Sequence, residues 1–205
     1  MRENINKGRR RGRRALVVSA AMTAGLAVTI VSSDQVAGEG WRAKAVLRDV
    51  SGQRLGVVRY EGDLGGTNVR VQVTGVAVGT DAFHGLHVHA GDGTGRCEPS
   101  TDPPFNNVGG HWTLAGETHG NHDGDLPPVL VQADGTGSAR TTTARLDPGQ
   151  VIGRAVVLHA GPDNLAHIPT RYFTTGTPPV AGPDADTKKA GDAGGRLACG
   201  IITGD

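Results

Sequence analysis

The feature that most constrains the fold is a series of short alternating segments separated by glycine-containing turns. In the clearest segment, 67–78 (TNVRVQVTGVAV), Val69, Val71 and Val73 alternate with polar residues, which is the period of a strand with one buried face. Seven similar runs are Trp41–Arg48, Leu55–Tyr60, Leu86–His89, Val129–Gln132, Ala139–Arg145, Val151–His159 and Leu197–Ile202. Turn signals separate them, and no helix with a convincing period is found. The pattern predicts an all-β domain, an eight-stranded antiparallel Greek-key sandwich or barrel.

The composition excludes several other classes of protein. With 205 residues the chain suffices for one domain of ordinary size, and 33 glycines disfavour a coiled coil. A hydrophobic content of 37% with a net charge of +1 disfavours intrinsic disorder. Two long stretches, Ala90–Pro128 and Ala160–Gly195, interrupt the strand pattern. Loops of this length in a compact domain usually carry function.

The first 40 residues have the composition of an export signal. Arginines between positions 9 and 14 precede Ala15–Val31, a run without charge, and this order is typical of a signal peptide. The run is short for a membrane span and contains small and polar residues, so a cleaved signal is favoured over a retained anchor. We therefore expect an exported protein, extracellular or in the cell envelope. Residues 1–40 would be the signal or anchor with a short linker, and 41–205 the β domain.

Charge is unevenly distributed along the chain. Residues 1–40 hold seven of the 21 Lys and Arg and three of the 20 Asp and Glu, which leaves 14 basic and 17 acidic residues in the remainder. A body without a basic excess has no general attraction for a phosphate backbone. We therefore expect no nucleic-acid partner, and membrane contact only if the N-terminal segment is retained.

Cys97 and Cys199 are the two cysteines of the chain, so oxidation allows a single pairing. An oxidising envelope favours the disulfide, and two buried free thiols are the alternative. A bridge closing a loop of about 100 residues would stabilise the fold by about 4–5 kcal/mol in the chain-entropy model.

All eight histidines lie between positions 84 and 167. In an exported protein this clustering indicates a metal site, because imidazole suits copper, zinc, iron and nickel. His87 and His89 stand two apart in the strand-like run GLHVHAG, so both rings project from one face. Taken alone, this pair has a second interpretation, as two surface histidines. His84 would point elsewhere and is interpreted as a supporting residue.

Further potential ligands fall in the two long stretches. The segment GGHWTLAGETHGNHDGDLPPV offers three imidazoles and one carboxylate, the kind of set that structural zinc prefers, namely His111, His119, His122 and Asp125. His159 ends the valine-rich run of VIGRAVVLHAGPDN, with Asp163 four residues later. His167 matches no ligand pattern and is expected to be a loop histidine.

Four segments in this order resemble the Cu,Zn superoxide dismutases of exported bacterial type. GLHVHAG resembles the first copper motif of the family, and GGHW through HDGDLPPV resembles its bridging-histidine and zinc segment. VVLHAGPDN resembles the last copper motif, and GDAGGRLACGII the C-terminal signature. The resemblance extends over Trp41–Ile202, and NLAHIPTRYF is most similar to actinobacterial members.

The resemblance implies a role for each of these residues. The copper ligands would be His87, His89, His111 and His159. The zinc ligands would be His111, which is shared between the metals, and His119, His122 and Asp125. Asp163 would be the carboxylate that hydrogen-bonds one copper histidine and one zinc histidine. Arg196 would be the arginine of the copper channel, and Cys97 and Cys199 would form the intrasubunit disulfide.

The activity implied is the conversion of superoxide to dioxygen and hydrogen peroxide by copper redox cycling, with zinc as a structural metal. In this reading His111 leaves copper on reduction and carries a proton, and Arg196 attracts and docks the anion. The resemblance does not determine the oligomeric state, and a homodimer is one of the states it allows.

The sequence departs from the family pattern between His119 and His122, which are three apart where the family has a longer loop. In such a loop His119 need not be a ligand, Glu117 is a candidate substitute, and a copper-only dismutase is the main variant. A copper-binding protein without activity is the alternative in another class, although a copper buffer would not need Arg196. An adhesion or structural β-sandwich would leave the histidine cluster unexplained.

Overall fold

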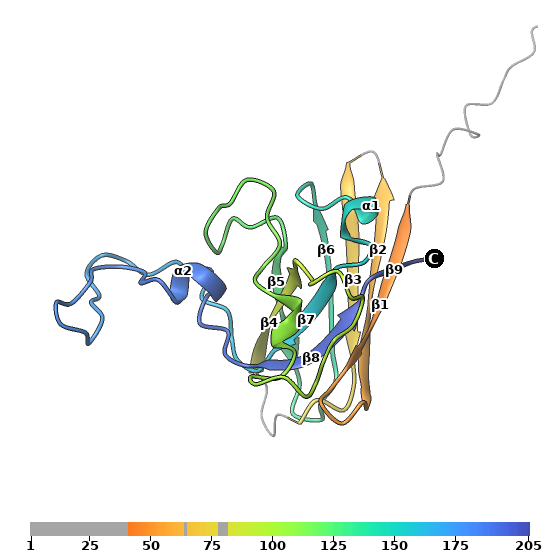
Figure 1. Cartoon of the computed structure of the whole chain (residues 1–205), viewed down its shortest axis with the longest axis horizontal. Helices are drawn as coiled ribbons and strands as arrows, with labels where there is room; N and C mark the ends of the chain where they lie inside the picture. Colours follow the sequence, from red (N-terminus) through yellow and green to blue (C-terminus); the bar gives the residue numbers. More distant parts are fainter. Residues whose placement is uncertain (1–40, 64, 78–81) are drawn as a thin grey trace, which may run out of the picture. The chain divides into compact units, whose positions relative to one another are not determined.

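The chain folds into a closed antiparallel barrel (Figure 1). A computed structural model describes residues 41–63, 65–77 and 82–205. The strands within these residues are β1 (Arg42–Arg48), β2 (Arg54–Asp63), β3 (Gly66–Val73), β4 (Ala82–His89), β5 (Asp125–Val131), β6 (Gly137–Thr143), β7 (Ala155–His159), β8 (Arg196–Ile201) and β9 (Thr203–Gly204). Their order is β2-β3-β6-β5-β4-β7-β8-β1-β9, and pairing of β1 with β2 closes eight strands into the barrel. The predicted all-β, eight-stranded antiparallel fold is confirmed.

Four short elements were not expected from the sequence, and one of them is a 3-10 helix, Asn106–Val108, in the connection between β4 and β5. The strand β9 adds two residues beside β1, and two four-residue helices, α1 (Pro148–Val151) and α2 (Thr187–Ala190), lie in connections. The predicted strand Val151–His159 is wrong in its first part, because Val151 ends α1 and β7 begins at Ala155. The side chain of Asp147 caps α1 by accepting a hydrogen bond from the Gly149 N–H at 2.7 Å. A helix of one turn is too short to leave a 3.6-residue period in the sequence.

The barrel is filled by side chains that alternate inward along the strands. In β1, for example, Ala43, Ala45 and Leu47 are buried while their polar neighbours are exposed. A second, smaller cluster contains Phe105, Val157 and Cys199 and lies between the barrel and the connection from β4 to β5. This second cluster holds part of the long loop firmly against the strands that carry histidines.

Two long connections leave the barrel, one between β4 and β5 and the other between β7 and β8, and the second projects away from the strands together with α2 (Figure 1). The disulfide between Cys97 and Cys199 ties the first connection to β8, with Cα atoms 5.9 Å apart, so the predicted pairing is confirmed. No helix among the described residues is both long and apolar enough to cross a membrane. The expected export signal or anchor in residues 1–40 lies outside the described residues and stays a prediction.

Candidate metal centre

Four histidines meet where strand β4 lies against β7. His87 and His89 point to one side of β4, His159 is the last residue of β7, and an isolated bridge between His89 and His111 brings the loop histidine to the strand. Their candidate ligand atoms all lie within 4.8 Å of one another. Register between β4 and β7 therefore brings together His89 and His159, which are 70 positions apart in the sequence.

The nitrogens at the centre of this copper-type cluster lack other partners. His89 Nε2 and His159 Nε2 are 3.3 Å apart, while His87 Nδ1 and His111 Nε2 are buried with no hydrogen-bond partner among the described residues. Buried polar atoms in proteins are nearly always paired, so converging unpaired imidazole nitrogens fit a site for a metal that prefers nitrogen.

The outer nitrogens of two rings are held by backbone carbonyls. His89 Nδ1–H donates to the Gly109 oxygen at 2.9 Å, and His159 Nδ1–H donates to the Gly194 oxygen at 3.1 Å. A proton on Nδ1 leaves the lone pair on Nε2, which faces the cluster. The backbone thus selects the tautomer that can bind a metal.

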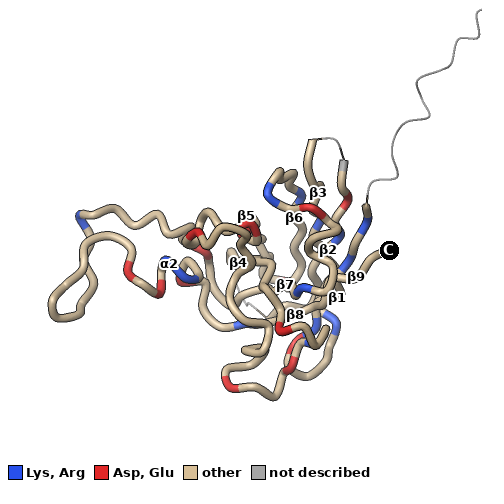
Figure 2. Tube along the Cα trace, turned by 45° about the horizontal axis from the view of Figure 1, so that its top comes forward, with Lys and Arg blue, Asp and Glu red and all other residues tan. Residues whose placement is uncertain are grey.

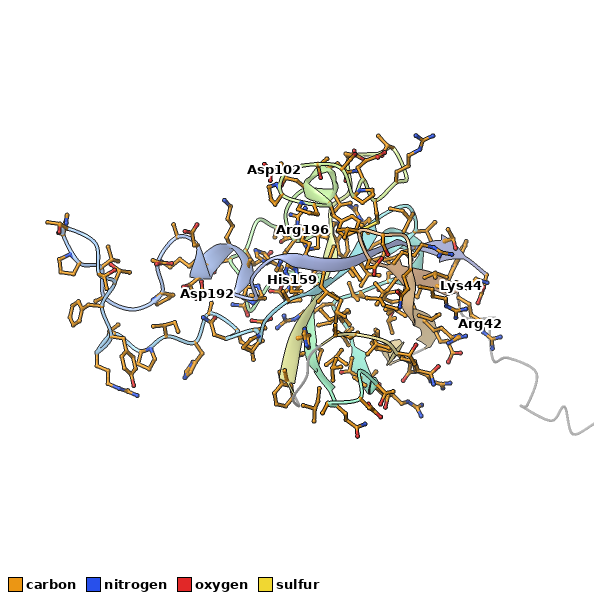
Figure 3. All side chains as sticks on the ribbon, turned by 90° about the horizontal axis from the view of Figure 1, so that it is seen from below. Arg42, Lys44, Asp102, His159, Asp192 and Arg196 are labelled. Atoms are coloured by element: carbon orange, nitrogen blue, oxygen red, sulfur yellow. A yellow bond between two sulfur atoms is a disulfide. The ribbon has the colours of Figure 1, made fainter. Side chains whose placement is uncertain are left out.

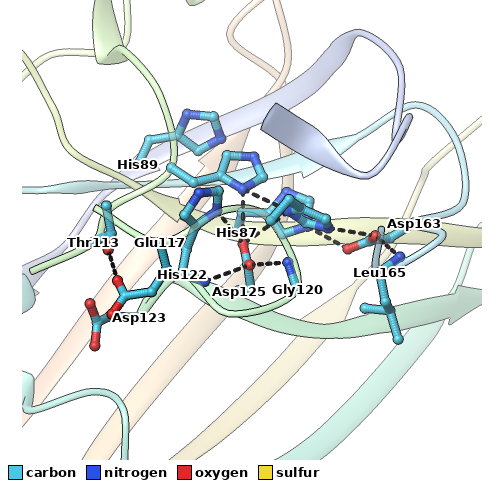
Figure 4. A network of polar contacts seen from close by, with 12 residues as sticks. His87, His89, Thr113, Glu117, Gly120, His122, Asp123, Asp125, Asp163 and Leu165 are labelled. Atoms are coloured by element: carbon cyan, nitrogen blue, oxygen red, sulfur yellow. Dashed lines mark hydrogen bonds and ion pairs between the residues drawn. The ribbon is translucent and has the colours of Figure 1, made fainter. Parts of the chain in front are cut away.

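A second group of ligand atoms adjoins the first around Asp125 (Figure 4). We call it the zinc-type cluster, and its residues are His111, His119, His122 and Asp125. Asp125 Oδ1 lies 2.9 Å from His111 Nδ1, 3.2 Å from His119 Nδ1 and 3.3 Å from His122 Nδ1. Tetrahedral zinc with bonds of about 2.0–2.1 Å places neighbouring ligands about 3.3 Å apart. The distances from Asp125 Oδ1 to three histidines therefore suit this ion, but His122 is not among the residues whose ligand atoms all lie within 4.8 Å of one another.

Asp125 also shapes the short turn that carries two of these histidines. Its Oδ2 accepts hydrogen bonds from the Gly120 N–H at 2.7 Å and from the His122 N–H at 3.0 Å. Arg145 supports the turn from outside by donating to the Gly120 oxygen at 3.2 Å. Gly120 has φ +89°, which a residue with a side chain rarely adopts. A three-residue step can therefore present both rings, because one carboxylate folds the backbone around itself.

Glu117, the candidate substitute ligand, is exposed and accepts a hydrogen bond from Thr113 Oγ1 instead. His87 also lies within 4.8 Å of the His111, His119 and Asp125 ligand atoms. Its Nε2, however, lies 2.7 Å from Asp163 Oδ2, so Nδ1 remains for the copper-type cluster.

Asp163 joins the two clusters. Its Oδ2 accepts from His87 Nε2 and its Oδ1 from His119 Nε2, both at 2.7 Å, and its side chain is fully buried (Figure 4). Gly191 packs directly over the second contact, and a Cβ atom there would collide with both Asp163 Oδ1 and His119 Nε2. The carboxylate orients one ring of each cluster at once.

The copper/zinc superoxide dismutase family model matches residues 55–202. The chain belongs to this family. It is 37% identical over 168 residues to the Cu-Zn superoxide dismutase of Mycolicibacterium paratuberculosis, covering 76% of this chain and 71% of that protein. It is 36% identical over 163 residues to the Cu-Zn superoxide dismutase of Mycobacterium tuberculosis, covering 74% of this chain and 65% of that protein. A crystal structure of the clock protein EA4 is similar at a TM-score of 0.57 and 26% identity, over 80% of this chain and 95% of the other. Membership makes this chain an oxidoreductase of the superoxide dismutase class, with copper and zinc as the metals of the family.

Burial keeps three imidazoles of the dismutase neutral in the metal-free protein. It lowers the pKa of His159 to about 3 and that of His111 to about 4, and it holds the pKa of His89 well below the usual value. Neighbouring cationic groups, Arg196 among them, lower the pKa of His89 and His159 further. Because the neutral ring is the form that binds metal, these sites are ready for a cation at neutral pH.

His119 differs from them because two carboxylates touch it. Burial lowers its pKa, but hydrogen bonds to Asp125 and Asp163 outweigh this effect and raise the pKa to about 9. The pKa values of both carboxyl groups, although raised by burial, are driven below their usual range by the histidines. The metal-free zinc-type cluster therefore favours a positive charge among its carboxylates, which a bound cation would supply.

Arg196 of the dismutase begins β8 and reaches the first long connection. Its Nη1 donates to the Phe105 oxygen and its Nη2 to the Gly109 oxygen at 2.6 Å. Burial lowers the pKa of this half-buried guanidinium, which nevertheless stays cationic at working pH. The predicted anion-docking residue thus lies at the edge of the copper-type cluster.

The remaining histidines lie outside both clusters. His84 is buried, and its Nδ1–H donates to the His159 oxygen at 2.8 Å, in line with a supporting role. It stands three residues before His87, and residues an odd number apart on a strand face opposite sides. His167 is exposed in the second long connection. Sequence reasoning missed Gly109 and Gly191, since their contributions are a carbonyl oxygen and a missing side chain, which no motif records.

Proposed function

We propose that the chain disproportionates superoxide at the four-histidine cluster, with copper held by His87, His89, His111 and His159. Bound there, copper would supply one-electron redox chemistry toward superoxide. The convergence of four imidazole nitrogens, two of them buried without partners, carries this proposal. Burial that keeps these rings neutral supports it further.

His111 is the residue proposed to handle a proton. Its Nδ1 faces Asp125 and the zinc-type cluster, and its Nε2 faces the copper-type cluster. Because contacts at Nδ1 hold the ring, Nε2 can change its bonding partner while the ring stays in place. His111 would take up a proton at Nε2 and donate it to the departing peroxide.

Arg196 is proposed to attract and position the anion. The two carbonyls hold its guanidinium in place, and they use two of its five N–H groups. The remaining donors of a fixed cation can bond a small anion beside the cluster.

Zinc is proposed as the structural metal at His111, His119, His122 and Asp125. The distances around Asp125 Oδ1 support four-coordinate binding, and the absence of Glu117 from this group removes one competing arrangement among the described residues. If metal analysis finds copper but no zinc, the protein is a copper-only dismutase instead.

Export to the extracellular space or cell envelope is proposed from the leader composition together with the disulfide. Homodimer formation and membrane contact through a retained N-terminal segment stay predictions, as do the domain boundaries.

The deciding experiment loads the purified chain with copper and zinc, measures both metals, and follows superoxide decay. Rapid decay that depends on copper is expected. Stoichiometric copper binding without superoxide turnover would instead identify a copper-binding protein that uses the same fold without the chemistry.

A further inference from the structure

Basic side chains on the barrel are confined to one part of its wall. Among the described strands, every Lys and Arg except Arg196 belongs to β1, β2, β3 or β6. These exposed residues are Arg42, Lys44, Arg48, Arg54, Arg59, Arg70 and Arg140. The acidic residues of the same strands are Glu61 and Asp63, both near the end of β2. We call the seven cations the basic strand face. It exists although the residues from 41 onward carry more acids than bases overall.

Strand register aligns four of these cations in one row. Lys44 is opposite Arg59, Arg59 is opposite Arg70, and Arg70 is opposite Arg140. With strands about 4.8 Å apart, the row spans about 14 Å across the sheet. Like charges directly opposite each other destabilise a sheet. The stability of the fold therefore gives no reason for this row.

Part of the row is left without a counter-charge. Lys44 pairs with Asp205, and Arg70 lies 3.3 Å from Glu61. Arg59 and Arg140 form no ion pair with any described residue. Figure 2 shows blue segments along β1 and its neighbours, with red segments beside them near the end of β2. The face thus presents free positive charge to solvent.

The metal centre remains open when this face is covered. Arg42 and Lys44 lie on one side of the molecule and Asp192 on the other, with His159 and Arg196 between them (Figure 3). The copper-type cluster is built on β4 and β7, which do not belong to the basic strand face. A partner on this face would leave access for a small anion.

An exposed tryptophan lies at the border of the face. Trp41 precedes Arg42, is 68% exposed, and is held to β2 where its carbonyl accepts the Gly62 N–H at 2.9 Å. Tryptophan is enriched where proteins meet the headgroup region of a bilayer. In the sequence, the apolar run Ala15–Val31 ends ten residues before Trp41.

We propose that the basic strand face docks this dismutase on a membrane surface rich in anionic phospholipids. Because the cations are spread over four neighbouring strands, several of them can contact phosphate headgroups at once, and Trp41 can insert at the border of the face. A soluble polyanion would bind the cations of the face, but contact with the exposed indole of Trp41 would add little to its affinity. Superoxide turnover does not depend on this docking, so the two proposals fail independently.

The test is partition of the metal-loaded full chain onto phosphatidylglycerol–phosphatidylcholine vesicles, with pure phosphatidylcholine vesicles as reference. Arg59→Gln/Arg140→Gln removes the two unpaired cations, and Arg96→Gln/Arg171→Gln removes two exposed cations from the loops. The first double variant should bind roughly tenfold to thirtyfold more weakly, and the second within about twofold of the parent chain. The N-terminal segment is identical in both variants, so the difference between them reports on the face. High salt should abolish this difference.

Two further measurements separate docking from a structural role. Trp41 emission should shift to the blue on phosphatidylglycerol vesicles, and the shift should vanish in Trp41→Phe, where buried Trp112 is the tryptophan left. Thermal unfolding of Arg59→Gln/Arg140→Gln should be unchanged or higher, because like-charge repulsion is relieved. Equal losses of vesicle binding in both double variants, or no loss in either, would overturn the proposal. Binding to soluble polyphosphate that needs Arg59 and Arg140, without binding to vesicles, would replace it with a soluble polyanion.

Discussion

Arg196 and His89 share one hydrogen-bond acceptor. The Gly109 carbonyl oxygen lies 2.6 Å from Arg196 Nη2 and 2.9 Å from His89 Nδ1. One peptide group therefore fixes both the cation that would dock superoxide and the tautomer of a proposed copper ligand. The disulfide anchors the same connection to β8, so docking and ligation depend on a single piece of backbone.

The first prediction concerns charge at Arg196. Arg196→Glu should lower kcat/KM for superoxide by about a hundredfold, because an attractive charge becomes repulsive beside the cluster. Arg196→Lys keeps the charge but loses the two-carbonyl geometry, so a reduction of about tenfold or less is expected. The rate of the parent protein should also fall as salt rises. A rate that ignores both substitutions and ionic strength would show that Arg196 does not steer the substrate.

The copper site is tested by His89→Ala. Superoxide turnover should fall at least about a hundredfold, since one of four proposed ligands is lost and its neighbours stay in place. Far-UV circular dichroism should still report the barrel, because the core and the Cys97–Cys199 disulfide are intact. Copper content and activity are the measurements. Full activity in this variant would refute His89 as a ligand.

The zinc site is tested by Asp125→Ala. Zinc should be lost and thermal stability should fall, because metal binding contributes to folding and because the Gly120 and His122 N–H groups lose their acceptor. The unpaired N–H groups alone should cost about 1–3 kcal/mol each if they remain buried. Copper should be retained, since the rings of His87, His89 and His159 bond to Asp163, Gly109 and Gly194 and form no hydrogen bond or ion pair with Asp125.

Glu117→Ala is the matched control in the same connection, and it should retain zinc because Glu117 is exposed and bonded to Thr113. Loss of zinc in Glu117→Ala would mean that the turn binds metal in another arrangement. If the parent protein refolded with both metals binds copper alone, the copper-only reading replaces the zinc proposal.

Gly191 provides a test of the carboxylate that joins the clusters. Gly191→Ala should lower thermal stability by about 1–3 kcal/mol, because φ is +60° and the new methyl group would displace Asp163 from His119. Zinc affinity should fall with it. Gly195→Ala, in the same connection with open space around it, should change neither quantity by a comparable amount. Similar effects from both substitutions would contradict a specific role for Gly191.

The strands and the kinds of ligand could be predicted from the sequence because both are local properties. Val69, Val71 and Val73 show the strand period without any partner strand, and the pair His87 and His89 places two rings on one face by geometry alone. The short helix α1 was missed because a single turn carries no period, and the cap at Asp147 looks like any other turn.

By itself, the sequence determined an all-β fold with a histidine-rich, disulfide-linked site. Tertiary structure alone decided how Asp125 folds the short turn around its own carboxylate. It also decided that the Gly109 carbonyl accepts hydrogen bonds from His89 and Arg196, and that Gly191 packs over the Asp163–His119 contact. It also decided the row of Lys44, Arg59, Arg70 and Arg140, which the acidic average charge of the body concealed. The physical reason is register: hydrogen bonding between strands sets which distant residues become neighbours, and that pairing is not written in any one segment.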